Sequence, residues 1–158
     1  MSKTCYYAIR PKCGSNLALS VDLNNPNGNL IVNTLPNGTP GDEMLWQLIT
    51  VVTPGTNYPP AAVNRKTGLA IYAGQGEAAV TQVPFDQVIG SSYDPSRCTW
   101  NLPGVAQGNY GAFQLSGDGS QNLNVLGDGP YGPGSQVGVW DWEGGGDNES
   151  WICTPYFL

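Results

Sequence analysis

The stretch Leu123 to Trp151, LNVLGDGPYGPGSQVGVWDWEGGGDNESW, carries the pattern that decides the fold. It opens with the alternating triplet LNV at 123–125, breaks into a Gly- and Pro-rich loop, and resumes as VGVW at 137–140. Alternation of this kind predicts two short, half-buried strands joined by turns. The same stretch holds an amide at Asn124, a flat ring at Trp140 and a second amide at Asn148. Those groups suit a shallow site for a neutral, hydroxyl-rich ligand.

The composition extends this prediction to the whole chain. The 158 residues include 22 Gly and 13 Pro scattered between short apolar runs, which favours many turns and an all-β fold. A chain of this length is expected to form a single domain, residues 1–158. Only 11% of the residues are charged and the net charge is -6, so we expect no nucleic-acid partner.

The sequence contains no histidine, which excludes Ser-His and Cys-His catalytic arrangements within this chain. Asp118 and Asp128 lie in Gly-rich turns without the ligand spacing of a calcium loop. We therefore expect no catalytic residue, no metal and no cofactor. No apolar run is long enough for a membrane span or a signal peptide. We expect no membrane insertion, and a protein that is cytoplasmic or secreted without a recognisable signal peptide.

Three blocks of similar pattern divide the chain, at residues 6–52, 58–103 and 110–156. Each ends near a tryptophan, and the apolar triplets near the start of each block recur at comparable intervals. For the first block two registers fit: Leu17 and Leu19 match Leu123 and Val125, or Val21 and Leu23 do. Each block supplies about four short strands and cannot bury its apolar face alone, whereas three blocks can share one core. The repeat predicts a β-trefoil, three four-stranded units about a pseudo-threefold axis. The block-ending tryptophans are Trp46, Trp100 and Trp151.

The blocks resemble the repeats of the ricin-B-type lectins, in the VDL of 21–23, the LNV of 123–125, the GSQVGVW of 134–140 and the closing tryptophans. The resemblance implies a carbohydrate-binding β-trefoil. This chain departs from the family's closing Gln-x-Trp, because Met44, Cys98 and Glu149 stand two residues before the tryptophans. The interior polar ties of that glutamine are expected to be absent or altered. A different trefoil family, such as the protease inhibitors that share the fold, therefore remains an alternative.

In the resembled family a sugar site needs an Asp or Asn in the first triplet, an aromatic after the third strand, and a polar residue before the closing tryptophan. The third block meets all three needs with Asn124, Trp140 and Asn148, and Gly138 lies on the same strand as Trp140. The resemblance implies galactose- or N-acetylgalactosamine-type glycans as ligands. The partners expected are thus glycans or glycoconjugates, with a homodimer left open.

The other two blocks are less complete. The first keeps an acid, Asp22, and offers Glu43 before its tryptophan, but Asn33 or Thr34 falls at the aromatic position, which predicts a second, weaker site. The second block has Ala70 in its triplet and Arg97 before Trp100, and is expected to be structural only.

The sequence also carries expectations for the cysteines and for the loops of a possible protease inhibitor. The four cysteines are either buried hydrophobic side chains or contain one bridge, and a trefoil brings its first and last strands together, so Cys5 with Cys153 is the preferred pair. If the chain were instead a protease inhibitor, the inserting loops would be Thr53 to Pro60 or Val83 to Pro95.

Overall fold

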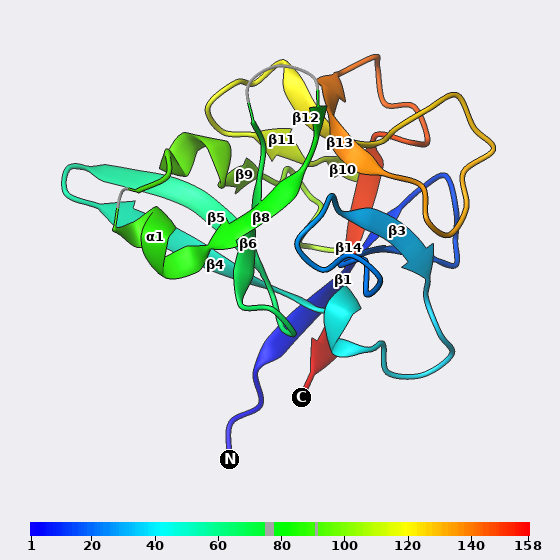
Figure 1. The fold of residues 1–158 in the computed structure, drawn as a ribbon, viewed down its shortest axis with the longest axis horizontal. Coiled ribbons are helices and arrows are strands. Elements are labelled where there is room, and N and C mark those ends of the chain that lie inside the picture. The colour runs from blue at the N-terminus through cyan, green and yellow to red at the C-terminus, as the bar shows by residue number, and fades with distance from the viewer. Residues whose placement is uncertain (75–77, 91) are drawn as a thin grey trace.

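The computed structural model describes residues 1–74, 78–90 and 92–158, and most of its regular structure is β-strand (Figure 1). Strands from all three blocks form a closed ring of neighbours. In that ring β1 pairs with both β14 and β4, β4 pairs with β5, β5 contacts β9, β9 pairs with β11, and β10 pairs with β14. The ring strands are β1 (Cys5–Pro11), β4 (Trp46–Thr53), β5 (Thr56–Asn64), β9 (Trp100–Asn101), β10 (Gly111–Ala112), β11 (Gln114–Leu115) and β14 (Ser150–Phe157).

Each block also contributes an antiparallel pair that lies against this barrel. The first pair is β2 (Leu17–Ser20) with β3 (Ile31–Thr34), the second is β6 (Leu69–Tyr72) with β8 (Thr81–Pro84), and the third is β12 (Gln121–Val125) with β13 (Val137–Asp141). The short strand β7 (Ala78–Ala79) pairs with β13 and so connects the second block to the third. The four short strands expected of the first block are present as β1, β2, β3 and β4.

The three block-ending tryptophans share one core. Trp46, Trp100 and Trp151 are fully buried and belong to a single apolar cluster that also includes residues of every strand pair. The indole N–H of Trp46 donates to the Leu19 carbonyl at 3.0 Å, and that of Trp151 donates to the Leu123 carbonyl at 2.7 Å. These two bonds make Leu19 and Leu123 equivalent positions.

This equivalence corrects the register of the repeat. The backbone N–H of Val21 donates to the Glu43 carbonyl, and that of Val125 donates to the Asn148 carbonyl, so Val21 matches Val125. Both registers considered from the sequence were wrong by two residues, in opposite directions. Side chains two apart on a strand face the same way, so a shift of two leaves the apolar pattern unchanged.

A second apolar cluster lies outside the barrel. The β4–β5 hairpin is long and carries an irregularity between Thr50 and Val51, and the short helix α1 (Phe85–Ile89) packs against β8 and β4. Between them lie Val51, Ala61, Val83 and Val88, all buried. Two single-turn 3-10 helices complete the structure, at Asp42–Met44 and Pro95–Arg97.

The cysteines, which all lie in the described ranges, form no disulfide bond, and Cys5 with Cys153, the pair preferred in case a bridge formed, is wrong. The first and last strands do pair, as expected, but the register sets Cys153 opposite Ile9 and Cys5 opposite Phe157. Four residues of strand separate the two positions by roughly 13 Å, well beyond the Cα–Cα distance of about 7 Å that a bridge can span. All four cysteines, each within the described residues, are free thiols.

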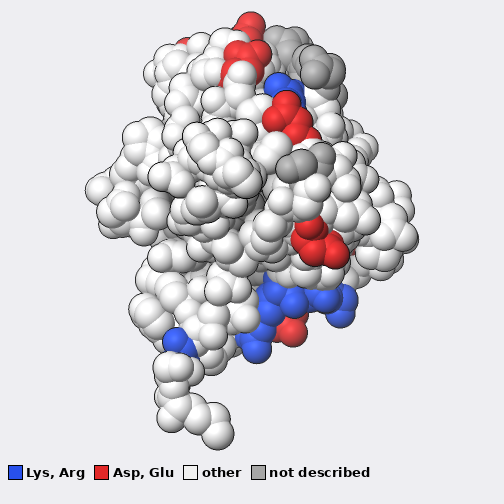
Figure 2. Space-filling model, turned by 90° about the vertical axis from the view of Figure 1, so that its left-hand side faces the viewer, with Lys and Arg blue, Asp and Glu red and all other residues white. Residues whose placement is uncertain are grey.

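The surface is poor in charge. On the face that Figure 2 shows, Lys, Arg, Asp and Glu side chains form a few separate groups on a mostly uncharged surface. No helix in the described ranges is long and apolar enough to cross a membrane. Nor do the His, Cys, Asp and Glu side chains at the described positions form a group of three that could hold a metal ion.

Candidate functional site

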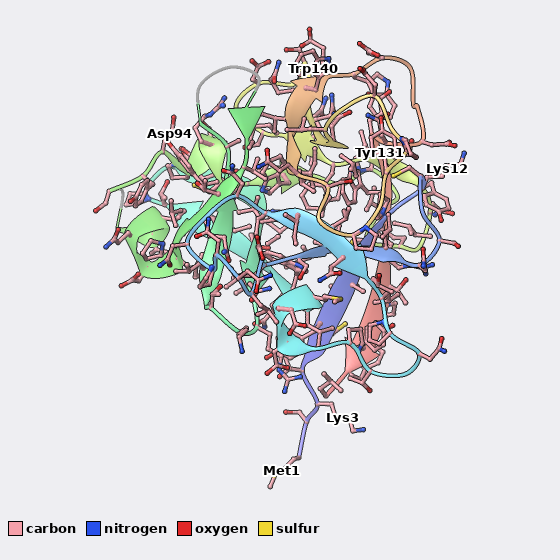
Figure 3. All side chains as sticks on the ribbon, turned by 45° about the vertical axis from the view of Figure 1, so that its right-hand side comes forward. Met1, Lys3, Lys12, Asp94, Tyr131 and Trp140 are labelled. Carbon is pink, nitrogen blue, oxygen red and sulfur yellow. The ribbon has the colours of Figure 1, made fainter. Side chains whose placement is uncertain are left out.

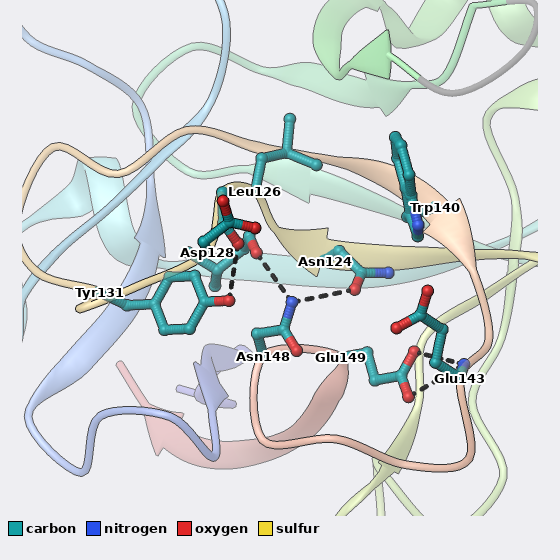
Figure 4. Close-up of a pocket in the computed structure, with 10 residues that line it drawn as sticks. Asn124, Leu126, Asp128, Tyr131, Trp140, Glu143, Asn148 and Glu149 are labelled. Carbon is teal, nitrogen blue, oxygen red and sulfur yellow. Dashed lines mark hydrogen bonds between the residues drawn. The ribbon is translucent and has the colours of Figure 1, made fainter.

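A pocket of about 600 Å³ opens beside the β12–β13 pair (Figure 4). It brings together the three residues predicted from the third block, which the chain separates by up to 24 positions. In Figure 4 Asn124 lies between Trp140 on one side and Asn148 on the other. The pocket is lined by Asn124, Val125, Leu126, Gly127, Asp128, Tyr131, Trp140, Glu143, Asn148 and Glu149.

Trp140 and Trp142 differ in what they contact. Both rings are partly exposed, at 43% and 41%, but Trp140 lines the pocket whereas Trp142 does not. Trp142 lies against the following loop, where a Cβ added at Gly145 would approach its ring to 3.3 Å. Two roles are possible for an aromatic ring at position 140: it can stack on a ligand, or it can pack under this loop and support it. Trp142 occupies the supporting position, which leaves the Trp140 ring open to the pocket (Figures 3 and 4).

The two amides are linked by hydrogen bonds. Asn148 Nδ2 donates to the Val125 carbonyl at 3.1 Å and, more weakly, to Asn124 Oδ1 at 3.4 Å, while Asn124 Nδ2 donates to the Asn122 carbonyl at 2.9 Å. Asn124 is only 3% exposed and forms the floor of the pocket. An amide carries two donor hydrogens and an oxygen with two lone pairs, so each side chain retains capacity for a ligand hydroxyl.

Glu149 fixes the loop on one side of the pocket. Its carboxylate is 2% exposed and accepts hydrogen bonds from the backbone N–H groups of Glu143, Gly145 and Gly146, at 2.8 to 3.1 Å. Gly144 and Gly145 have φ values of 92° and 90°, a left-handed conformation that turns successive N–H groups toward one anion. The polar tie of the third block is therefore altered rather than absent, because a carboxylate holds the loop.

Tyr131 lies across the pocket from this loop. Its hydroxyl donates to the Gly127 carbonyl at 2.8 Å, and its oxygen can still accept a bond from a ligand. Burial raises the pKa of the Tyr131 phenol, and the neighbouring Cys13 and Asp128 act in the same direction. The phenol therefore remains a neutral hydroxyl under physiological conditions.

Gly138 lies next to the pocket but does not line it. It is buried on β13 directly opposite Asn124, with Ala79 on its other side. Gly138 is thus placed to support Asn124 from the neighbouring strand.

The predicted second site at Asp22 loses its basis in the corrected register. Ser20, which is buried, is the equivalent of Asn124, and Asn33 is the equivalent of Trp140. Asp22 lies two positions further on, where its carboxylate accepts the Asn24 N–H at 3.0 Å in a local turn. The first block therefore presents no acid at the position of Asn124 and no aromatic ring at the position of Trp140, and the acid it does offer is Glu43, the equivalent of Asn148.

The second block also lacks the pocket residues. The Ala73 N–H donates to the Arg97 carbonyl, so Arg97 is the equivalent of Asn148, as the sequence predicted, while Tyr72 rather than Ala70 matches Asn124. Arg97 is buried and its Nε donates to the Ala73 carbonyl at 2.9 Å. Its guanidinium serves the backbone of its own block.

Four of the pocket residues that carry polar side chains were not predicted as ligand contacts: Asp128, Tyr131, Glu143 and Glu149. They lie in the two Gly-rich loops between and after the strands, where no periodicity marks a side chain as facing a site. The only available signal was the Gln-to-Glu departure at Glu149. The segments proposed as inhibitory loops are largely regular structure, since Thr53–Pro60 is the end of the β4–β5 hairpin and Val83–Pro95 contains α1. Position 91 of the second segment lies outside the described residues.

No family model and no curated protein sequence matches the chain. Solved structures do match. A designed threefold-symmetric protein, ThreeFoil, superposes with a TM-score of 0.70 at 23% identity, covering 94% of this chain and 97% of that one. The chain has the β-trefoil fold. The trefoil predicted from the three blocks is confirmed.

Natural trefoil lectins superpose as completely. The C-half of an earthworm R-type lectin, solved with GalNAc, has a TM-score of 0.66 at 17% identity over 96% of this chain and 98% of its own. A ricin B-like lectin from Macrolepiota procera, solved with lactose, has a TM-score of 0.66 at 16% identity over 97% and 96%. The trefoil is thus shared with the ricin B-like lectins that the sequence resembles.

Proposed function

We propose that the chain is a carbohydrate-binding protein without catalytic activity, and that the pocket of the third block binds galactose- or N-acetylgalactosamine-type glycans. One observation carries the proposal: the exposed ring of Trp140 and the amides of Asn124 and Asn148 line a single pocket. An aromatic face stacks on the C–H face of a sugar, and neighbouring amides pair with adjacent hydroxyls. The lectins that share the fold were solved with GalNAc and lactose, which supports the choice of sugar.

The chemistry of the pocket supports binding without bond cleavage. Glycoside hydrolysis requires two carboxyl groups, one of them a proton donor, on either side of the bond. The buried carboxylate in this pocket, Glu149, already accepts four hydrogen bonds from backbone N–H groups. With both oxygens engaged in holding the loop, Glu149 is not free to donate a proton. The other two acids that line the pocket, Asp128 and Glu143, are exposed, whereas the proton donor of a glycosidase is held in a buried, apolar setting.

A glycan array with three proteins tests the proposal. We expect wild type to bind galactose- or N-acetylgalactosamine-terminated glycans and Trp140→Ala to lose that binding. Phe157→Ala removes an exposed aromatic ring on β14 that neither lines the pocket nor supports its loops, and should retain binding. Binding by Trp140→Ala as strong as by wild type, or no binding of any glycan by wild type, would overturn the proposal.

A further inference from the structure

The pocket is acidic on the side that faces solvent. Three of its ten lining residues are Asp128, Glu143 and Glu149, and none of the ten is Lys or Arg. Because Glu149 is buried and fully hydrogen-bonded, the charge available to a ligand is that of Asp128 and Glu143, both of which are exposed. In Figure 4 these two carboxylates lie on opposite sides of Asn124 and approach the pocket from different loops.

A cation on this side of the molecule, Lys12, has partners of its own outside the pocket lining. Lys12 lies on the same side of the molecule as Tyr131 (Figure 3). Its Nζ is 3.9 Å from Asp147 Oδ1 and 5.8 Å from the centre of the Tyr110 ring. A ligand in the pocket therefore meets two carboxylates and no compensating ammonium or guanidinium among the lining residues.

We infer that Asp128 and Glu143 make this pocket selective for the charge of the sugar. The pocket takes neutral and amine-bearing hexoses and rejects hexoses that carry a carboxylate, such as uronic acids. Hydroxyl and ammonium groups donate hydrogen bonds to the two carboxylates, and bonds to an ionised acceptor are the stronger kind. A sugar carboxylate offers only acceptors and a like charge. The inference rests on the proposed function, because it concerns the same pocket.

The size of the effect follows from Coulomb's law. Two exposed like charges, each about 4–5 Å from a bound carboxylate, weaken its binding roughly twentyfold at the dielectric constant of water without salt, and roughly tenfold with the screening of about 0.1 M salt. The factor is larger where water is displaced. At high ionic strength, near 1 M, the screening length shortens to about 3 Å and the discrimination should shrink.

Matched sugars provide the test. Galacturonic acid differs from galactose only at C6 and galactosamine differs from it only at C2, and glucose with its acid and amine gives a second series. Binding is followed by NMR through the Trp140 indole N–H signal, assigned by its loss in Trp140→Phe. We expect galactosamine in its protonated form to bind at least as well as galactose, and galacturonic acid to bind roughly tenfold more weakly than galactose.

Charge-neutral variants localise the effect. Asp128→Asn with Glu143→Gln should bring the acid and the neutral sugar to similar affinities. Asp86→Asn, in α1 and outside the pocket, changes the net charge without changing the lining and should leave the ratio as in wild type. If the double variant does not fold, the wild-type ratio measured at low and high salt carries the same information.

The outcomes separate the two proposals. Equal binding of galactose and galacturonic acid by wild type would overturn the charge selectivity and leave sugar binding standing. The charge selectivity would also be overturned if the ratio of the two affinities did not change with salt in wild type and was the same in the double variant as in wild type. If none of the six sugars perturbs Trp140, and the glycan array is also negative, sugar binding itself fails and this inference fails with it.

Discussion

The Glu149 carboxylate accepts the backbone N–H of Glu143 through both of its oxygens, at 3.1 and 3.0 Å. A buried anion thereby fixes the loop position from which the Glu143 side chain reaches the pocket. The residue that departs from the lectin repeat pattern is thus the residue that shapes one wall of the site. Stability and sugar binding should both depend on it.

Replacing Glu149 by Gln should therefore weaken the protein and the site together. A neutral oxygen accepts bonds about half as strong as a carboxylate does, and the amide NH₂ would face the Glu143 N–H, donor against donor. We expect urea denaturation to show a loss of about 1–3 kcal/mol in the free energy of unfolding, and glycan binding to weaken.

The control for this change is Glu43→Gln, a loss of the same charge in the first block at the position equivalent to Asn148. Glu43 is partly exposed and should tolerate the change with little loss of stability. Equal stability of the Glu149 and Glu43 variants would show that the loop does not depend on the buried carboxylate.

The three core tryptophans should respond unequally to replacement by Phe. The indole N–H groups of Trp46 and Trp151 donate to backbone carbonyls, whereas that of Trp100 is buried without a partner in the described part of the chain. Phe removes a satisfied donor in the first two cases and an unsatisfied one in the third. We expect Trp100→Phe to cost about 1–3 kcal/mol less than Trp151→Phe in chemical denaturation. Equal costs would indicate that Trp100 has a hydrogen-bond partner in solution.

The thiols should differ in reactivity because burial disfavours the thiolate. Desolvation raises the pKa of both Cys98 and Cys153 to about 12, with Asp94 adding to the effect at Cys98. The thiolate is the nucleophile, so iodoacetamide at mildly alkaline pH should leave both unmodified in the native protein and label them after unfolding. Peptide mapping by mass spectrometry measures this. Rapid labelling of Cys153 in the native state would contradict its burial on β14, opposite Ile9 of β1.

The same shift predicts how stability changes with pH. A thiol whose pKa is higher in the folded state favours folding at pH values below its ordinary value, 9.0. That contribution is lost as the pH rises from about 9 toward about 12. The melting temperature should fall over this range, and Cys153→Ser should reduce the alkaline part of the fall. An unchanged alkaline profile in the variant would assign the fall to other groups.

Two N-glycosylation patterns should behave differently. Asn37-Gly38-Thr39 lies in an exposed loop, whereas the amide of Asn148, in Asn148-Glu149-Ser150, donates to the Val125 carbonyl inside the pocket. Expression through a glycosylating secretory pathway should add mass at Asn37 and none at Asn148. Thr39→Ala should then remove all of the added mass. Glycan at Asn148 would show that this residue is modified before its loop has folded.

The trefoil was predictable because three kinds of signal agreed. Alternation marked the strands, Gly and Pro marked the turns, and Trp46, Trp100 and Trp151 recurred with the period of the repeat. The register of the repeat could not be predicted more closely than two residues, because side chains two positions apart on a strand point to the same face of the sheet. That ambiguity decided whether Asp22 matched Asn124, and it could be resolved only by bonds such as that from Trp46 to Leu19.

The pocket was predictable at Asn124, Trp140 and Asn148, whose spacing from the closing Trp151 is fixed by the repeat, but not at most of its loop residues. Asn124 and Trp140 occupy fixed positions on β12 and β13, so their spacing already indicated a common site. Asp128, Tyr131 and Glu143 reach the pocket through loops whose paths depend on individual turns, such as the left-handed Gly144 and Gly145. The long β4–β5 hairpin had no signal of its own, because its sequence also suits two separate strands.

The pairing of β1 with β14 also sets how this domain can be joined to others. Thr4 and Leu158 exchange backbone hydrogen bonds at 2.9 and 3.0 Å, so both chain ends leave the barrel side by side. Trp140 lies at the other end of the molecule (Figures 1 and 3). A protein fused at either end would project away from the pocket, and a short linker between the ends would permit circular permutation with the pocket unobstructed. Either chain end can therefore carry a fused protein without covering the pocket.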